Sequence, residues 1–289
     1  MGPLIRAGAL LVRWPGDGPR LGTMLTTRGT TGSPDRLDLA TPDLKGAESF
    51  YGALFGWRFG PAGPEAGGHG TFRLQDGRTV AGATTVPPGQ APPGWTLSFR
   101  TPDADVTAAA VRDGGGTVLI EPTDVAGLGR TAVFADPAGV GFAVWEPGPH
   151  SGLDVVNEPY SLSWTELYTR DPAAAMAFYG AVLGIESSSV PWPDGTGSYL
   201  LLTPPGGDDD SSFGGVVPLG SDPVEAADGP CWEPYFEVPD TDTTAARARE
   251  FGGTVRLAPT ETGGVGRFAK LTDPYGARFA VITSTPAQP

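Results

Sequence analysis

Apolar residues recur at spacings of three and four in two stretches of the chain, and each stretch predicts an amphipathic helix. The residues that share one face of the first helix are Leu44, Ala47, Tyr51 and Leu54. The segment from Asp38 to Gly56 recurs without a gap from Glu166 to Gly184, at an offset of 128 (166 against 38). Each copy predicts a short strand, a turn capped by an aspartate, and a helix that ends at glycine.

A second repeat extends this plan. The segment from Pro102 to Val144 aligns without a gap with Pro239 to Val281, at an offset of 137 (239 against 102). Each copy predicts a helix and three strands, preceded by a strand at Trp95 to Arg100 or at Trp232 to Glu237. The chain therefore predicts an α+β fold of four βαβββ modules in two halves, which must pair to bury their sheets.

The repeats also place the domain boundaries. Residues 1–34 match nothing later in the chain and predict a mobile N-terminal arm. We expect a first domain at 35–148, a linker at 149–159 and a second domain at 160–289. The offset grows from 128 to 137 between Ser187 and Pro230, so the second half carries nine extra residues there. They predict a solvated loop, although loops at the rim of a site also contact ligands.

Composition and net charge argue against two classes of binding partner. The chain has 289 residues and a net charge of −14. It contains no basic run, so nucleic acid and anionic membranes are poor partners. A single cysteine, Cys231, excludes an intrachain disulfide, and the longest early apolar run, from Ala7 to Val12, is too short to span a membrane. We expect a cytoplasmic monomer, because four modules already form an internal pseudo-dimer.

The motifs TPDLKGAESFYGALFG, RDPAAAMAFYGAVLG, FADPAGVGFAVW and LTDPYGARFAVI resemble those of the vicinal oxygen chelate (VOC) superfamily. This superfamily contains glyoxalases, bleomycin-resistance proteins and extradiol dioxygenases. The resemblance covers roughly residues 36–285 and is greatest to bacterial chains with two tandem glyoxalase-like domains. It implies that paired modules curl into cups, and it leaves open lyase, isomerase, dioxygenase, thiol-transferase or metal-free drug-binding functions.

The family's metal ligands are largely absent here. The resemblance places its first ligands at seven residues before each helix-opening aspartate, and those positions hold Arg36, Thr96, Trp164 and Glu233. Its last ligand, a glutamate, falls on Ala143 and Ala280. A divalent metal needs about three oxygen or imidazole donors. The histidines, His69 and His150, fall in a predicted loop and in the linker. We therefore expect no metal and no cofactor.

The resemblance implies that its ligand positions project into the cups, and because strand side chains alternate with a period of two, residues two apart from a ligand position share that inward face. The predicted ligand-binding residues of the second cup are Trp164, Tyr168, Tyr235, Arg278 and Ile282, and those of the first are Asp38 and Trp145. The second cup is richer in aromatic and carboxylate groups, which suit a flat, partly polar organic molecule. We therefore expect the main site there.

Glu166 and Glu233 are the candidate catalytic residues. Two carboxylates in a partly apolar cavity do not both ionise freely, so one would act as an acid and the other as a base. Arg278 could instead neutralise one of them. Asp38 and Glu166 occupy equivalent positions in the repeat. The alternative to a catalytic role is therefore a structural hydrogen bond that both residues make. Trp95 and Trp232 point to the opposite side of their strands from the inward residues, and we expect them to pack beneath the helices.

These observations predict a metal-independent glyoxalase-like protein that binds a small aromatic or polyketide-like metabolite. It would either sequester that compound, as an antibiotic-resistance protein does, or convert it by acid–base proton transfer. The alternative is a metal-dependent lyase or dioxygenase with unorthodox ligands such as Asp38, Glu166 or Glu233. A structural protein whose two cups are closed by bulky side chains is a third possibility.

Overall fold

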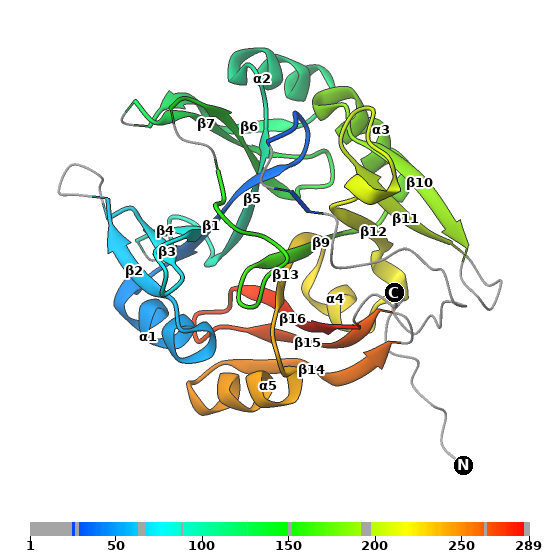
Figure 1. Ribbon diagram of the computed structural model, residues 1–289. Coiled ribbons are helices and arrows are strands. Elements are labelled where there is room, and N and C mark those ends of the chain that lie inside the picture. Colours follow the sequence, from blue (N-terminus) through cyan, green and yellow to red (C-terminus); the bar gives the residue numbers. More distant parts are fainter. Residues whose placement is uncertain are drawn as a thin grey trace.

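A computed structural model describes residues 25–26, 29–62, 68–87, 89–125, 127–149, 152–191, 198–262 and 265–285 (Figure 1). Most of the expected N-terminal arm, residues 1–24, 27 and 28, lies outside these ranges, as does His150.

The first half contains two βαβββ modules in one eight-stranded sheet. Its elements are β1 (Pro34–Thr41), α1 (Leu44–Phe55), β2 (Arg58–Pro61), β3 (Gly70–Arg73), β4 (Thr79–Thr85), β5 (Gly94–Arg100), α2 (Ala104–Asp113), β6 (Thr117–Asp124), β7 (Gly129–Ala135) and β8 (Gly141–Pro147). The strand order is β2-β3-β4-β1-β5-β8-β7-β6, so the first strands of the two modules pair at the centre.

The second half repeats this topology. Its elements are β9 (Leu162–Thr169), α3 (Pro172–Leu183), β10 (Glu186–Pro191), β11 (Ser198–Thr203), η2 (Asp209–Ser211), β12 (Gly214–Pro218), η3 (Leu219–Ser221), α4 (Pro223–Asp228), β13 (Cys231–Glu237), α5 (Thr241–Glu250), β14 (Thr254–Thr262), β15 (Gly266–Thr272) and β16 (Arg278–Ser284). The strand order is β10-β11-β12-β9-β13-β16-β15-β14. The predicted α+β fold of four βαβββ modules is confirmed.

The helix ends follow the sequence signals. The side chains of Asp43 and Asp171 cap α1 and α3 by accepting hydrogen bonds from the backbone N–H groups of Gly46 and Ala174. Gly56 and Gly184 close these helices in the left-handed conformation, each with φ of 70°. Side chains with a Cβ rarely adopt this conformation, which explains why both copies end on glycine.

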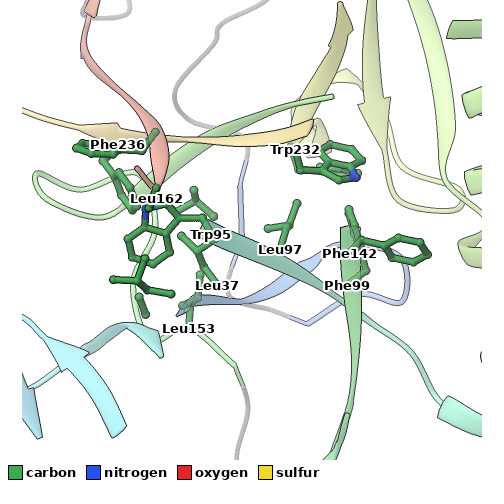
Figure 2. Packing of buried hydrophobic residues seen from close by; sticks show 14 of the residues in the cluster. Leu37, Trp95, Leu97, Phe99, Phe142, Leu153, Leu162, Trp232 and Phe236 are labelled. Carbon is green, nitrogen blue, oxygen red and sulfur yellow. The ribbon is translucent and has the colours of Figure 1, made fainter. Parts of the chain in front are cut away.

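The core lies between the two sheets and is shared by both halves. Figure 2 shows side chains of the first sheet meeting those of the second. The ring centroids of Trp95 and Phe236 are 5.5 Å apart, and those of Phe99 and Trp232 are 5.3 Å apart. The two tryptophans therefore pack in the interior, as their strand parity predicts.

Two equivalent hydrogen-bond chains join the halves across this core. Tyr51 donates to Asp273 Oδ2 at 3.2 Å and accepts from Trp95 Nε1. Tyr179 donates to Asp136 Oδ2 at 3.3 Å and accepts from the indole N–H of Trp232. Each helix tyrosine thus reaches the Asp-Pro turn of the other half, so the two halves form one packed unit. In Figure 1, α1 correspondingly lies beside α5, and α2 beside α3.

The segments that flank the sheets also make contacts. Leu25 is buried, and its carbonyl accepts a hydrogen bond from Asn157 Nδ2 at 2.7 Å. The N–H of Leu153 donates to the carbonyl of Asp35. The expected boundaries between arm, domains and linker stay predictions. None of the helices within the described ranges is long and apolar enough to cross a membrane.

Candidate functional site

Each sheet has one face turned away from the shared core, and we call these faces the first cup and the second cup. In the first, Asp38 lies opposite Thr96 on the central strand pair. In the second, Glu166 lies opposite Glu233, and Trp164 lies opposite Tyr235. Strand register therefore brings Glu166 and Glu233 to a common face, as the period-two alternation predicts.

The second cup is filled by its own side chains. All eight residues of β9 are buried, although a strand that covers one core should alternate between buried and exposed positions. The buried apolar residues of this cup form a cluster of their own: Trp164, Tyr168, Tyr199, Leu201, Val217, Leu219, Tyr235, Val265, Phe268, Ala280 and Ile282. Of the five second-cup ligand residues predicted, the four other than Arg278 are members of this cluster.

Glu166 sits at the centre of three tyrosine hydroxyls. Tyr235 donates to Glu166 Oε2 at 2.6 Å, and Tyr199 donates to Oε1 at 2.9 Å. Tyr168 also donates to Oε2. Trp164 Nε1 in turn donates to the hydroxyl of Tyr199 at 3.1 Å. A wholly buried carboxylate with this many donors is well compensated by hydrogen bonds.

Lys270 lies beside this group, and its buried ammonium pairs with three further carboxylates. Its Nζ is 2.6 Å from Asp222 Oδ2, 3.2 Å from Glu225 Oε1 and 3.6 Å from Glu233 Oε2. It also donates to the hydroxyl of Tyr168 at 2.8 Å. We call these five residues the Lys270 cluster.

Arginines complete the charge balance of the second cup. Arg256 bonds to both carboxylate oxygens of Glu225, at 2.8 and 3.0 Å, and lies 3.2 Å from Glu233 Oε1. Arg278 pairs with Glu225 Oε2 at 3.2 Å and makes no ion pair with Glu166 or Glu233 within the described residues. The expectation that Arg278 neutralises one of the two candidate acids is therefore not met, and Arg256 pairs with Glu233 instead.

Burial sets the protonation of these groups. It raises the pKa of Glu166, against the opposing effect of Lys270 and the tyrosine hydroxyls. It raises the pKa of Glu233 to about 7, although Lys270 and Arg256 act in the opposite direction. Burial alone would lower the pKa of Lys270, but Glu233, Glu225 and Asp222 raise it above its usual value. Lys270 is therefore a cation at neutral pH.

Part of the insertion in the second half supplies two residues of the Lys270 cluster. Gly82 and Gly215 pair with Asp38 and Glu166, so they are equivalent. From Gly82 to Thr96 the chain advances 14 positions (96 against 82), and from Gly215 to Glu233 it advances 18 (233 against 215). The longer connection forms η3 and α4, which carry Asp222 and Glu225 into the cup.

The first cup has a floor of smaller side chains. In β1, Leu37 and Leu39 are wholly buried while Arg36, Asp38 and Ala40 are only half-buried, as expected for a face open to solvent. Five inward positions are bulkier in the second half, and at the two repeat offsets they pair as Ala40 with Tyr168, Thr96 with Glu233, Ser98 with Tyr235, Thr131 with Phe268 and Val133 with Lys270. The outer face of the second sheet therefore carries bulkier side chains than the equivalent face of the first sheet at these five positions.

Arg36 is the principal charged group on the floor of the first cup. Its guanidinium carbon lies 4.3 Å from the centroid of the Trp145 ring. Its Nη2 donates to Asp38 Oδ1 at 3.3 Å, and both side chains are about one-fifth exposed (21% and 23%). A Cβ on Gly82 would overlap Asp38 Oδ1, so this glycine makes room for the pair.

The donor set in neither cup fits a resident metal ion. Glu233, the one carboxylate at a family ligand position, is held by Arg256 and Lys270, and Ala143 and Ala280 supply no donor. Throughout the described ranges, no group of three histidine, cysteine, aspartate or glutamate side chains is arranged to hold a metal. We therefore derive no chemistry through a metal here.

Sequence reasoning singled out Glu233 and Tyr168 but missed the other three members of the Lys270 cluster, Lys270, Asp222 and Glu225. Lys270 lies two positions from Phe268 on β15, and the period-two rule applied to that strand would have placed both inward. Its partners Asp222 and Glu225 lie in the insertion, which was expected to be solvated. Cys231, at the start of β13, is half-buried with its Sγ 3.9 Å from Glu225 Oε2.

Comparison with known proteins agrees with this architecture. The chain is 39% identical over 278 residues to anthracycline biosynthesis protein DauV of Streptomyces sp. strain C5, covering 91% of this chain and 97% of that protein. It is 36% identical over 262 residues to the putative glyoxylase CFP32 of Mycobacterium tuberculosis, covering 89% and 97% of the two chains. Among solved structures, the Mn(II)-bound glyoxalase from Novosphingobium aromaticivorans matches with a TM-score of 0.57 at 17% identity, over 90% of this chain and 86% of that chain. This last likeness concerns the fold.

The family model described as "Glyoxalase/Bleomycin resistance protein/Dioxygenase superfamily" matches residues 33–144 and 161–281, one match for each eight-stranded sheet. The chain therefore belongs to the glyoxalase/bleomycin resistance protein/dioxygenase superfamily, with two tandem glyoxalase-like domains.

Proposed function

We propose that this protein binds a planar polycyclic aromatic metabolite of the polyketide type, without a metal, in its first cup. The observation that carries the proposal is the difference between the two cups. The second cup is filled by buried side chains, whereas the first has smaller residues at several equivalent positions, of which Ala40, Thr96, Thr131 and Val133 are only half-buried. A site for an organic ligand needs unfilled concave surface with a few polar groups.

The relatives support the class of ligand. DauV is named an anthracycline biosynthesis protein, and anthracyclines are planar polycyclic aromatic polyketides. Asp38 and Trp145, both predicted from the sequence as ligand-binding residues, face this cup. The threonine and serine hydroxyls on the floor, from Thr96 and Ser98, suit the phenol and ketone oxygens of such compounds.

The test is to fill the first cup with the residues of the second. Ser98→Tyr and Thr131→Phe should reduce binding of 1,8-dihydroxyanthraquinone at least tenfold, measured by calorimetry or equilibrium dialysis. Tyr235→Phe, which changes the second cup, serves as the control and should bind like the parent. Trp145→Ala should weaken binding, and Trp164→Ala should not. Loss in Trp164→Ala with retention in Trp145→Ala would place the site in the second cup, as expected from the sequence.

The second candidate function is acid–base conversion of the ligand in the second cup, with Glu233 and Glu166 as the catalytic residues. The observation that favours it is the pKa of Glu233, which burial raises to about 7, together with a buried Oε2 that has no hydrogen-bond partner among the residues that the structure describes. Such a group exchanges a proton near neutral pH. If Glu233→Gln keeps the fold and ligand affinity but stops conversion of the bound compound, this candidate gains support. Unchanged conversion would rule it out.

A further inference from the structure

Arg36 is held in a way that leaves most of its donors unused. One face of its guanidinium lies against the Trp145 ring at 4.3 Å, which fixes the side chain over the floor of the first cup. A guanidinium has five N–H groups, and within the described part of the chain only Nη2 donates, to Asp38 Oδ1 at 3.3 Å. The long distance makes this a weak bond.

Arg256 shows how an arginine with a structural role is bonded in the same fold. It donates to Glu225, Asp228, Glu233 and the carbonyl of Val224, and its side chain is only 7% exposed. The side chain of Arg36 is 21% exposed, and among the described residues it makes one ion pair, with Asp38. Arg36 therefore offers donors to a molecule in the cup, whereas those of Arg256 are already used inside the protein.

Within the described ranges, two side chains at this point of the cup have unused N–H donors. Besides Arg36, the buried Trp145 Nε1 lacks a hydrogen-bond partner among the described residues. Asp38 Oδ1 already accepts from Arg36 and lies against the backbone of Gly82. An acceptor-rich ligand group balances this arrangement, because a planar carboxylate or a quinone with an ionised phenol accepts two parallel N–H bonds from a guanidinium.

We propose that Arg36 binds an anionic oxygen group of the ligand, so that the first cup prefers planar aromatic acids to neutral or cationic compounds with the same rings. This inference rests on the proposed function, since it requires that the ligand lies in the first cup. Asp38 then acts as a positioning residue that orients the guanidinium, and Trp145 supplies the surface on which the guanidinium lies.

The experiment compares three probes with one ring system: anthraquinone-2-carboxylate, 2-(hydroxymethyl)anthraquinone and 2-(aminomethyl)anthraquinone. At pH 7.5 we expect the parent protein to bind the carboxylate at least tenfold more tightly than the alcohol. Arg36→Gln should remove this preference while changing the affinity for the alcohol less than threefold, and Arg36→Lys should keep part of it. Arg112→Gln, at an exposed arginine of α2 that pairs with Glu121, is the matched control and should leave all three affinities unchanged.

The outcomes separate this inference from the proposed function. Equal affinity for the carboxylate and the alcohol, unaltered in Arg36→Gln, would overturn the role of Arg36 while leaving the ligand class in place. Tightest binding of the amine, lost in Asp38→Asn, would overturn it in favour of a cationic ligand held by Asp38. Failure of the parent protein to bind any of the three would contradict the proposed function itself.

Discussion

Replacing Lys270 by methionine removes the ammonium at the centre of the second cup and leaves its carboxylate neighbours in place. Three carboxylates lie within 2.6 to 3.6 Å of Nζ, and the Lys270 side chain is 1% exposed. Methionine keeps a similar unbranched chain, so loss of packing contributes little. Removing one partner of a buried ion pair costs about 3–5 kcal/mol, because the other charge is left uncompensated. We expect a loss of that size in the free energy of unfolding at pH 7.5.

The pH dependence of this loss follows from the same charges. Lys270 opposes the burial-driven rise in the pKa of Glu233, so without it that pKa rises further above 7. A carboxyl group whose pKa is higher in the folded than in the unfolded state binds more protons when folded, so stability falls as pH rises through that range. The destabilisation by Lys270→Met should therefore be larger at pH 8 than at pH 5.5.

Urea unfolding at both pH values measures this effect. The chain has one other lysine, the exposed Lys45, so Lys45→Met is a matched control that should change stability by no more than about 0.5 kcal/mol. A loss below about 1 kcal/mol in Lys270→Met, or a loss that is the same at both pH values, would refute the view that uncompensated buried charge dominates.

Three further expectations test other parts of the structure. Tyr51→Phe removes the hydroxyl between Trp95 Nε1 and Asp273 and should lower the free energy of unfolding by about 1–3 kcal/mol; a urea midpoint equal to the parent's would contradict this. Because the pKa of Glu233 rises from 4.5 to about 7 on folding, this group lowers the stability of the parent as pH increases across that window, and Glu233→Gln should remove its share of the slope. Light scattering should give the mass of one chain, 29.7 kDa, and a dimer that persists on dilution would show that modules pair between chains.

The sequence predicted the elements of the fold because their determinants are local. An aspartate cap and a terminal glycine define α1 and α3, and the parity of Trp95 places it on the core side of β5. The placement of Glu166 and Glu233 on one face followed from strand periodicity counted from the family's ligand positions, and the structure pairs them directly. Each of these signals lies within one element or one repeat offset.

The filling of the second cup was not predictable in this way. Inward carboxylates and tyrosines look the same in the sequence whether they face a ligand or compensate one another. Lys270 distinguishes these two cases, because its ammonium compensates the carboxylates. Its partners Asp222 and Glu225 lie at the start of α4, 48 and 45 positions earlier in the chain. The preference for the second cup as the main site stays a prediction, and the Trp145→Ala and Trp164→Ala pair decides it.

The tandem arrangement explains how one cup can be filled without harm to the other. Each cup lies on the outer face of its own sheet, while both sheets share the core between them. Fully burying a large apolar side chain contributes about 1.5–3 kcal/mol. Residues such as Phe268 and Ile282 therefore stabilise the second sheet on its cup face, in addition to the shared core on its other face. The first half has less apolar burial on its outer face, where Thr131 stands in place of Phe268 and is only half-buried. Because the halves are joined through Tyr51 and Tyr179, extra stability in the second sheet also supports the first. An open cup is thus tolerated in one domain because its neighbour is packed on both sides.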